Sequence, residues 1–568
     1  MKPIFPKTEH AVRLYQWLDK SCFPLLFVVM TLLLAVIIWL DLPPQRTALS
    51  DIFWEMNGGL RYLQGQEAYQ DYISHLGETY YLIIAIGIYL FGSQIETLAH
   101  TQVLLGVILA CIMWWIGRSR LPNILNFALT SYTALILFSP ISLGYLSSSA
   151  ATVAMQYNRF SYALAGIIII QLLIATPKHL NKHQLIIEGI LSGILLFLLT
   201  FIKFNATLAV IGIIATSLFF VHTHNILKIT SLITFISLLS ITGINLIGWL
   251  TYNISYIAEK AGSGVGQDRV ETLLNTVIYD VIIFSLGIFI LFTTLRHIRK
   301  SDSSVVLPTF RTFSYAIIFA PPLIGSILFF MNWQHALVQF FPHGIIIGMA
   351  LTIQHPHTTW IKATNRNFHY YTLLLLLITL LFAPTYFSLM RSIAAASWHK
   401  LQLTTFWSES HLSMHSDVTQ KLIMLPQPNN NTTTTTDELL SSLENKLKLN
   451  APLNNAEYVL KINNGLDLLK KHIKPDSHIY SYPLNPYPYL LQTPLPTPSI
   501  LWYYAKGSGQ IGKAPNLSLE SLFRNIDYVL ILKTELDHHM LRKTIEPYVK
   551  SHFTIIEQTS IWELYHRY

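Results

Sequence analysis

The sequence predicts a polytopic α-helical membrane protein that carries a small α/β domain after its last membrane span. Three observations predict this fold class. Apolar residues make up 52% of the 568 residues, charged residues only 12%, and the mean hydropathy is +0.42. Apolar runs long enough to cross a bilayer recur along the first two thirds of the chain. After residue 388 these runs stop, and short helical and alternating patterns replace them.

About eleven apolar segments have spanning or near-spanning length. The first, Phe23 to Leu40, follows a basic N-terminal stretch but lacks a small-residue cleavage site, so it is interpreted as an uncleaved anchor and not a signal peptide. One further apolar segment, Tyr80 to Phe91, is too short for a span and fits an interfacial or re-entrant helix. The other spans are expected at 97–116, 122–140, 160–176, 185–202, 205–222, 228–250, 274–294, 312–331, 337–354 and 368–388.

The positive-inside rule predicts the orientation. With the N-terminus in the cytoplasm and 80–91 not counted as a span, the inside loops carry fifteen Lys and Arg and the outside loops carry six. We therefore expect the first loop, 41–96, and everything after residue 388 on the extracytoplasmic side. Because the net charge of +8 is scattered over short loops, it indicates membrane orientation and argues against nucleic-acid binding.

Three regions follow from this pattern: a membrane module over 1–388, a connector over 389–436, and a soluble extracytoplasmic α/β domain over 437–568. The connector ends in QPNNNTTTTT, a run typical of a flexible linker. A proline-rich stretch at 482–499 predicts a loop without a regular element. Within the domain, helices are expected at 437–447, 456–472 and 536–553, strands at 478–482 and 527–533, and one or two terminal strands over 554–564.

Motifs of soluble enzymes are missing from the sequence. It contains no phosphate-binding Gly-rich loop after a strand, no HExxH and no CxxC. GSGVG, at 262–266, follows no strand and is interpreted as a flexible loop. Cys22 and Cys111 lie in apolar runs, which argues against a metal site or a structural disulfide.

Polar side chains instead gather on the predicted outside face. The first loop contains SDIFWEMNGGLRYLQGQEAYQDY, Ser50 to Tyr72, with acids at Asp51 and Asp71. Carboxylates at a membrane surface are costly, so they suggest a function, yet each acid could equally cap the helix that follows it. Arg159 and Lys203 lie at span ends, where reaching for the interface is the ordinary role of a cation. The same face is expected to hold Glu55, His75, Glu78, Asn158, Lys260, Asp268, Arg269, Asn332 and His335.

Several short motifs between residues 45 and 210 carry a resemblance to a known family. They are the early Asp51, G-x-x-x-Y-x-D at 65–71, LFGSQ at 90–94, GRSR at 117–120, YNRFSYAL at 157–164 and LLTFIKFNATL at 198–208. In their order, and with an outside α/β domain after the last span, they resemble the GT-C superfamily. Its members are integral-membrane glycosyltransferases that use lipid-phosphate sugar donors, such as protein O-mannosyltransferases and the aminoarabinose transferases of lipid A.

The resemblance implies an inverting transfer of a sugar from a polyprenyl-phosphate donor to a glycan, lipid or protein acceptor, at the outer face of a bacterial inner membrane. By position, Asp51 matches the family's general base. The resemblance also implies supporting residues: Asp71, Glu78 and His75 would position the acceptor or a metal, and Arg159, Lys203, Lys260 and Arg269 would hold the donor phosphate. The usual adjacent acid pair is absent, because Ile52 follows Asp51, and SHLGETYY replaces the usual Pro-rich or His-Pro stretch. A requirement for Mg²⁺ or Mn²⁺ and the acceptor class therefore stay open.

Two other classes of function remain as alternatives. A transporter or flippase for a lipid-linked saccharide would favour inverted repeats and charges in the middle of spans. The sequence shows no such repeats, and nearly every charge lies at a span end, with Glu188 and Asp280 as the main exceptions. A non-catalytic envelope assembly protein would tolerate the loss of Asp51, whereas the enzyme would not.

Overall fold

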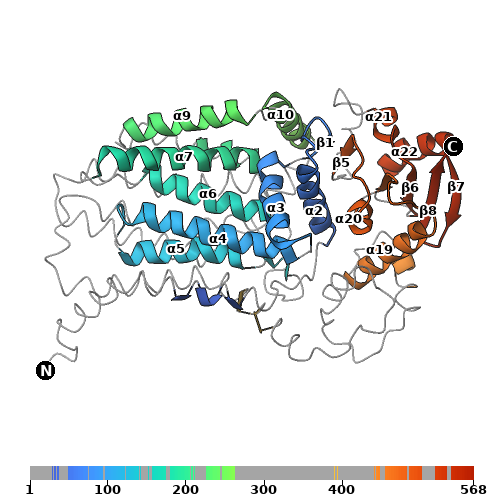
Figure 1. The fold of residues 1–568 in the computed structure, drawn as a ribbon, viewed down its shortest axis with the longest axis horizontal. Helices are drawn as coiled ribbons and strands as arrows, with labels where there is room; N and C mark the ends of the chain where they lie inside the picture. Colours follow the sequence, from blue (N-terminus) through green and yellow to red (C-terminus); the bar gives the residue numbers. More distant parts are fainter. Residues whose placement is uncertain are drawn as a thin grey trace. The chain divides into compact units, whose positions relative to one another are not determined.

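The structure is a computed structural model. The structure describes the following residues, together with a few shorter stretches between them: 49–74, 76–93, 96–121, 123–139, 156–173, 180–204, 225–242, 246–262, 455–482, 485–501, 518–533 and 539–568. The chain divides into two compact units (Figure 1). Unit 1 comprises Met1–Val36, Gln102–Ser139 and Gln156–Met390, and unit 2 comprises Ile37–Thr101, Pro140–Met155 and Arg391–Tyr568. The predicted boundaries at 388 and 436 lie outside the described residues and stay predictions.

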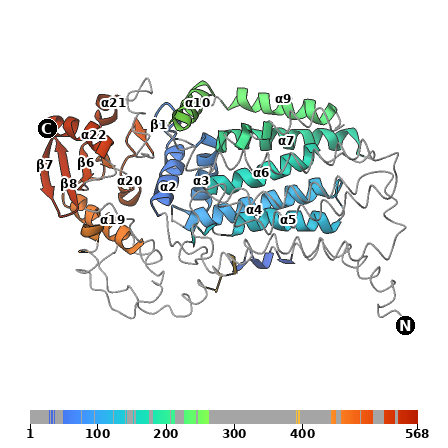
Figure 2. The same ribbon diagram turned by 180° about the vertical axis from the view of Figure 1, so that it is seen from behind.

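Unit 1 is built from apolar helices that run side by side, as both ribbon views show (Figures 1 and 2). The spans predicted at 97–116, 122–140, 160–176 and 185–202 are helical: they form α4 (Glu96–Gly117), α5 (Asn123–Phe138), α6 (Gln156–Leu173) and α7 (Lys182–Ile202). Two of the described helices, α4 from Thr97 and the whole of α7, are long and apolar enough to cross a membrane. The spans predicted at 274–294, 312–331, 337–354 and 368–388, and most of those at 23–40 and 205–222, lie outside the described residues.

The continuous span predicted over 228–250 is interrupted in the structure. The chain forms α9 (Asn225–Ile241) and then α10 (Leu246–Gly262), and the two axes are bent by 103° at the break. The sequence at the break includes Gly243 and Asn245, two residue types with low helix propensity, whereas hydropathy alone registers only a continuous apolar run. The pair would count as a third span if it were taken as one broken element.

Helices α7 and α9 approach each other closely through two glycines one turn apart. A Cβ added at Gly193 would lie 2.6 Å from the backbone oxygen of Ser231 and 2.7 Å from Cβ of Thr234. One at Gly189 would lie 2.7 Å from Cβ of Thr230 and 2.9 Å from the backbone oxygen of Leu227. This small-xxx-small spacing lets the two backbones pack without an intervening side chain.

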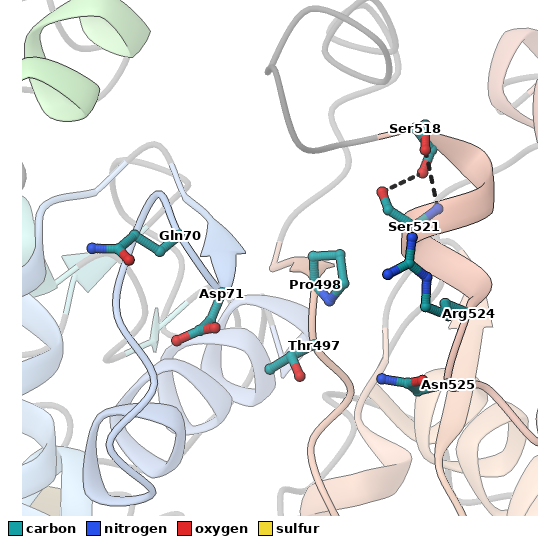
Figure 3. Close-up of a pocket in the computed structure, with 8 residues that line it drawn as sticks. All are labelled: Gln70, Asp71, Thr497, Pro498, Ser518, Ser521, Arg524 and Asn525. Carbon is teal, nitrogen blue, oxygen red and sulfur yellow. Dashed lines mark hydrogen bonds between the residues drawn. The ribbon is translucent and has the colours of Figure 1, made fainter.

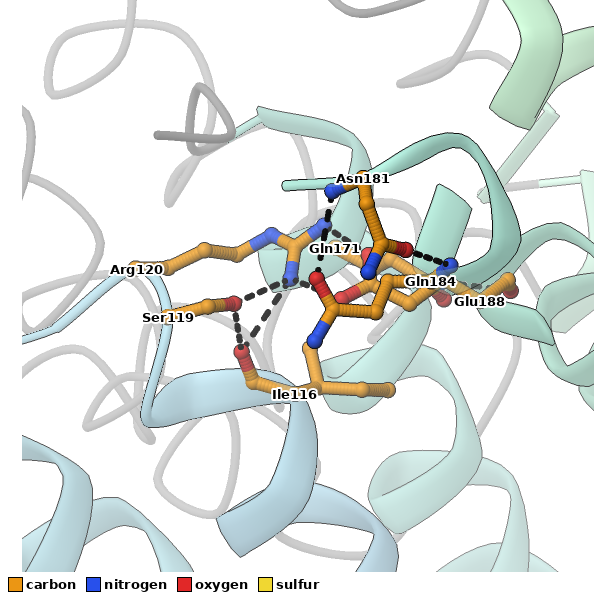
Figure 4. Close-up of polar contacts among 7 residues, drawn as sticks. All are labelled: Ile116, Ser119, Arg120, Gln171, Asn181, Gln184 and Glu188. Carbon is orange, nitrogen blue, oxygen red and sulfur yellow. Dashed lines mark hydrogen bonds and ion pairs between the residues drawn. The ribbon is translucent and has the colours of Figure 1, made fainter. Parts of the chain in front are cut away.

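A buried ion pair joins the end of α4 to α7 (Figure 4). Arg120 Nη1 donates to Oε1 of Glu188 at 3.0 Å, Nη2 pairs with the second carboxylate oxygen, and both side chains are almost fully buried. Arg120 also donates to the backbone oxygen of Ile116 at 3.1 Å, which is one of the last carbonyls of α4. Gln171 of α6 donates to the backbone oxygen of Glu188 at 2.6 Å. Three helices are therefore tied together at one end of unit 1.

Unit 2 contains two short helices from the first loop. Helix α2 (Leu49–Leu63) packs on α3 (Glu78–Phe91), and a Cβ at Gly58 would lie 2.1 Å from the ring of Tyr81. Glycine therefore stands in the helix, at a cost in propensity of about 1 kcal/mol, because α3 fills the space that a side chain would need. The expectation that 80–91 forms a helix too short to count as a span is confirmed, since α3 has 14 residues.

The remainder of unit 2 is a four-stranded mixed sheet with flanking helices. Strands β4 (Ile479–Tyr482) and β6 (Tyr528–Leu532) are parallel, and β8 (Trp562–Arg567) pairs antiparallel with β6 and with β7 (Phe553–Gln558). Helices α19 (Asn455–Lys470) and α22 (His539–His552) accompany it, and all of these elements were expected from their patterns. Short pieces complete the described set: β2 (Ile141–Ser142), β3 (Ala151–Thr152) and α21 (Leu519–Phe523).

The expectation of a loop without regular structure over 482–499 is wrong in part. Residues Tyr487–Leu491 form helix α20, and Ser499–Ile500 form β5. Proline is compatible with the first turn of a helix, where its missing N–H would have no partner, and Pro486 and Pro488 stand there. Strand β5 pairs in parallel with β1 (Tyr72–Ile73), which joins this stretch to the first loop.

Candidate functional site

Asp51 lies in the first turn of α2, which begins at Leu49. Asp51 is therefore not the N-cap of this helix. Its negative charge in the first turn is still stabilised by the helix dipole. The side chain is half-buried and lies near Tyr458 of α19. Burial, and then the negative charge of Asp51, raise the pKa of the Tyr458 hydroxyl. The rings of Phe53 and Tyr458 stack with 6.4 Å between their centroids, so α19 forms one wall beside the acid.

Lys461, one turn further along α19, is buried against the same aromatic ring. Its Nζ lies 4.3 Å from the centroid of Tyr458, and only 7% of the residue is exposed. Burial lowers its pKa from 10.5 to about 8. Sequence reasoning missed both Tyr458 and Lys461 because they lie about 400 residues from Asp51. A lysine on the apolar face of a predicted helix was the signal that could have indicated one of them.

The G-x-x-x-Y-x-D motif builds the turn after α2. Gly65 has a φ of +74° directly after the helix, and Tyr69 has a φ of +67°. The Tyr69 hydroxyl donates to the backbone oxygens of Ser74 and Leu76 at 3.1 and 3.0 Å. Asp71 Oδ2 accepts the backbone N–H of Glu67 at 2.8 Å. Asp71 therefore shapes its own loop and does not cap α3, whose N-cap is Gly77.

Buried polar contacts hold this loop against the segment around residue 496. Arg61 is 1% exposed, and its guanidinium donates to the backbone oxygen of Pro496 at 2.8 Å and to Oε1 of Gln66 at 2.6 Å. Gln66 in turn donates to the backbone oxygen of Leu495 at 3.2 Å. Asn57 of α2 donates to the backbone oxygen of Asn485 at 3.1 Å. The first loop and the C-terminal part are thus one packed body, which the positions of single residues in the sequence did not indicate.

A polar pocket of about 530 Å³ opens beside Asp71 (Figure 3). Arg524 and Asn525 extend toward Thr497 and Pro498 from one side, and Asp71 borders the other side. The lining combines a carboxylate, a guanidinium, two side-chain amides and three hydroxyls: Gln70, Asp71, Thr497, Pro498, Ser518, Ser521, Arg524 and Asn525. Such a surface suits a hydrophilic ligand.

The expected supporting acids do not converge on a metal site in the described part of the chain. Burial, and then the charge of Glu67, raise the pKa of the half-buried Glu78 carboxyl. His75 lies outside the described residues. Among the described residues, no group of three or more His, Cys, Asp and Glu side chains is placed to hold a metal ion. The described side chains therefore do not gather a ligand set for the divalent cation that the sequence left open.

The expected phosphate-binding cations belong to unit 1. Lys203, the C-cap of α7, donates to Oδ1 of Asn158 at the start of α6, and its Nζ lies 5.2 Å from the centroid of the Tyr157 ring. Arg159 is 1% exposed and donates to the backbone oxygen of Ser139, at the end of α5. The structure thus brings Arg159 and Lys203 to the same end of two packed helices. Lys260 lies in α10, but its side-chain surroundings are outside the described set, as is Arg269 altogether.

No protein-family model and no curated protein sequence matches the chain. Among solved structures, it is similar to ArnT from Cupriavidus metallidurans bound to undecaprenyl phosphate, with 10% identity, a TM-score of 0.46, and coverage of 96% of this chain and 97% of that one. It is also similar to the Archaeoglobus fulgidus oligosaccharyltransferase tethered with an acceptor peptide, with 11% identity, a TM-score of 0.38, and coverage of 91% and 69%.

A third similar structure is the archaeal oligosaccharyltransferase AglB from Archaeoglobus fulgidus in complex with an inhibitory peptide and a dolichol-phosphate. Its identity is 11%, its TM-score is 0.36, and the coverage is 97% of this chain and 75% of that one. The chain is thus similar to each of these solved structures, at 10–11% identity.

Proposed function

We propose that this chain is an integral-membrane glycosyltransferase. It transfers a sugar from a polyprenyl-phosphate donor in the membrane to a hydroxyl or amine of an envelope glycan, lipid or protein. Asp51 takes the proton of the acceptor as its oxygen or nitrogen attacks the anomeric carbon. The bond from that carbon to the phosphate oxygen breaks, polyprenyl phosphate leaves, and the configuration inverts. A phosphate leaving group is a weak base and needs charge neutralisation more than a strong acid.

The observation that carries this proposal is the paired placement of Arg159 and Lys203. Polar and aromatic partners hold these two cations at adjacent ends of α6 and α7. Two cations at one place neutralise a lipid phosphate better than two cations on separate faces. Glycosyl transfer from a polyprenyl phosphate is also what the sequence resemblance implies.

The surroundings of Asp51 support its role as the base. A half-buried carboxylate near Tyr458 is partly shielded from water, which suits a general base. The positive-inside pattern supports a location of this site on the outer face of a bacterial inner membrane, with the region 437–568 on the same side.

The test uses purified full-length protein and a panel of polyprenyl-phosphate sugars, with release of polyprenyl phosphate as the readout. Wild type should release it with at least one donor when acceptor lipids or glycans are present. Asp51→Asn should lose about 10²–10⁴-fold in kcat, because the base is gone while size and shape stay. Arg159→Gln and Lys203→Gln should lower the rate of transfer, because the donor phosphate loses a cation that neutralises it. Lys182→Gln, at the opposite end of α7 and exposed, is the matched control and should behave as wild type.

Full transfer by Asp51→Asn would reject the assignment of the base, and the absence of release with every donor would reject the function. The transporter alternative gains no support from the described residues. Glu188, one of its two mid-span charges, is neutralised by Arg120, and Asp280 lies outside the described residues. An assembly protein would show partner binding that does not depend on Asp51.

A further inference from the structure

The pocket beside Asp71 has a chemistry that the transfer reaction alone does not assign (Figure 3). We propose that it binds a saccharide carrying an acidic group, with the phosphate or carboxylate held by Arg524 and ring hydroxyls held along the wall formed by Asp71 and Thr497. The identification of that saccharide as part of the acceptor rests on the proposed function, whereas its binding does not.

Arg524 is the anion-binding group of the pocket. Its side chain is exposed, extends into the pocket and makes no ion pair or side-chain hydrogen bond with any residue that the structure describes. A guanidinium presents a planar fork of donors that matches the two oxygens of a carboxylate or phosphate. An anion that enters the pocket can therefore pair with Arg524 without displacing a described partner.

The other lining residues suit hydroxyl groups. Asp71 Oδ2 already accepts the backbone N–H of Glu67, which orients the carboxylate, and a carboxylate with one such bond keeps acceptor capacity for ligand hydroxyls. Asn525 and Thr497 offer both donors and acceptors. Pro498 is the only apolar lining residue among those described, so the pocket does not suit an acyl chain. Carboxylate, amides and hydroxyls together fit a polyhydroxylated ring.

The two segments that carry Asp71 and Pro498 are joined by backbone hydrogen bonds. Ser499 N donates to the backbone oxygen of Asp71 at 3.0 Å, and Leu501 N donates to that of Ile73 at 3.1 Å, so the two lining segments are paired as β1 and β5. Arg61 holds the neighbouring Pro496. A binding surface that is already ordered loses little conformational entropy when a ligand binds.

The experiment is a titration of full-length protein in detergent with three probes that share a ring: glucose, glucuronic acid and glucose 6-phosphate. We expect at least one acidic probe to bind about tenfold tighter than glucose at low salt, because charge-assisted hydrogen bonds exceed neutral ones, and we expect the advantage to shrink at high salt. The ratio of the affinities for the two acidic probes tells whether a carboxylate or a phosphate is preferred.

Variants test which residues cause the preference for acidic probes. Arg524→Gln should abolish the preference for acidic probes and leave the affinity for glucose unchanged, and Arg524→Lys should keep part of the preference. Asp71→Asn, which can still accept the Glu67 N–H, should weaken all three probes. Lys474→Gln removes an exposed cation that does not line the pocket, and it should bind like wild type.

Equal affinity for the three probes, a preference unchanged in Arg524→Gln, or an equal loss of preference in Lys474→Gln would overturn the proposal. Asp51→Asn separates it from the transferase function. If that variant binds the probes normally and lacks transfer, both stand. If it binds normally and transfers normally, the base assignment fails and the pocket stands. If binding is absent while wild type transfers sugar, the pocket fails alone.

Discussion

At the residue scale, two buried charged sites among the described residues differ in their partners. Arg120 and Glu188 neutralise each other with two parallel hydrogen bonds, an arrangement in which each charge makes the other tolerable. Lys461 instead faces an aromatic ring, and the described residues offer it no carboxylate partner. A cation kept buried at such a cost, beside the tyrosine that adjoins Asp51, suggests a role in the site more than in stability.

Lys461→Met should therefore stabilise the protein at neutral pH. The pKa of Lys461 is lowered to about 8 in the folded state from 10.5, so the unfolded chain binds the extra proton between these values and stability rises with pH across that window. The destabilisation caused by burying the charged Lys461 side chain is fully present below pH 8 and amounts to about 3 kcal/mol. Attraction between the cation and the Tyr458 ring offsets about 1 kcal/mol of it. Thermal unfolding measured from pH 7 to above 10 checks this.

In Lys461→Met the rise of stability between pH 8 and 10.5 should be missing. Lys470→Met, at an exposed position of the same helix, is the control and should keep the rise. A rise that persists unchanged in Lys461→Met would show that another group causes it.

Breaking the Arg120–Glu188 pair should destabilise the protein, in contrast to Lys461→Met. Glu188→Gln leaves a buried guanidinium without a counter-charge and should cost about 3–5 kcal/mol, whereas the double change Arg120→Met with Glu188→Leu should recover most of the loss. Unfolding of the single and double variants in detergent measures the coupling. Arg118→Gln, which removes an exposed cation of the same turn, should cost little. A double variant as unstable as Glu188→Gln would argue that the pair's packing, and not its charge, matters.

At the element scale, glycine spacing decides how helices approach. Gly193→Ala should destabilise the α7–α9 contact by about 1–3 kcal/mol, because the new methyl would meet the backbone of α9 and the helices would have to separate. The higher helix propensity of alanine is too small to offset this. Ile190→Ala, on the exposed side of α7, is the control for an alanine placed away from α9 and should cost little. A thermal midpoint in Gly193→Ala equal to that of wild type would contradict the close approach.

At the scale of the whole molecule, the first loop is joined to residues more than 400 positions later in unit 2. Arg61→Ala should loosen this joint, since three guanidinium hydrogen bonds are lost and the buried oxygen of Pro496 is left without its donor. Hydrogen exchange of the Ser499 and Leu501 amides, which bond to the first loop, should accelerate by at least about tenfold. Gln64→Ala, exposed beside the same turn, should leave these amides protected. Unchanged exchange in Arg61→Ala would show that strand pairing alone holds the joint.

The sequence by itself determined the elements whose pattern is local. Hydropathy located α4 to α7, length distinguished α3 from a span, and short strand-like runs located β4 and β6, because each of these patterns lies within one segment. Sequence resemblance supplied Asp51, Arg159 and Lys203 as candidates. Only the tertiary structure decided the bend between α9 and α10, the placement of Asp51 near Tyr458, and the pocket of Asp71 and Arg524. These depend on which surfaces meet across hundreds of residues, and a periodicity within one segment carries no information about its partner.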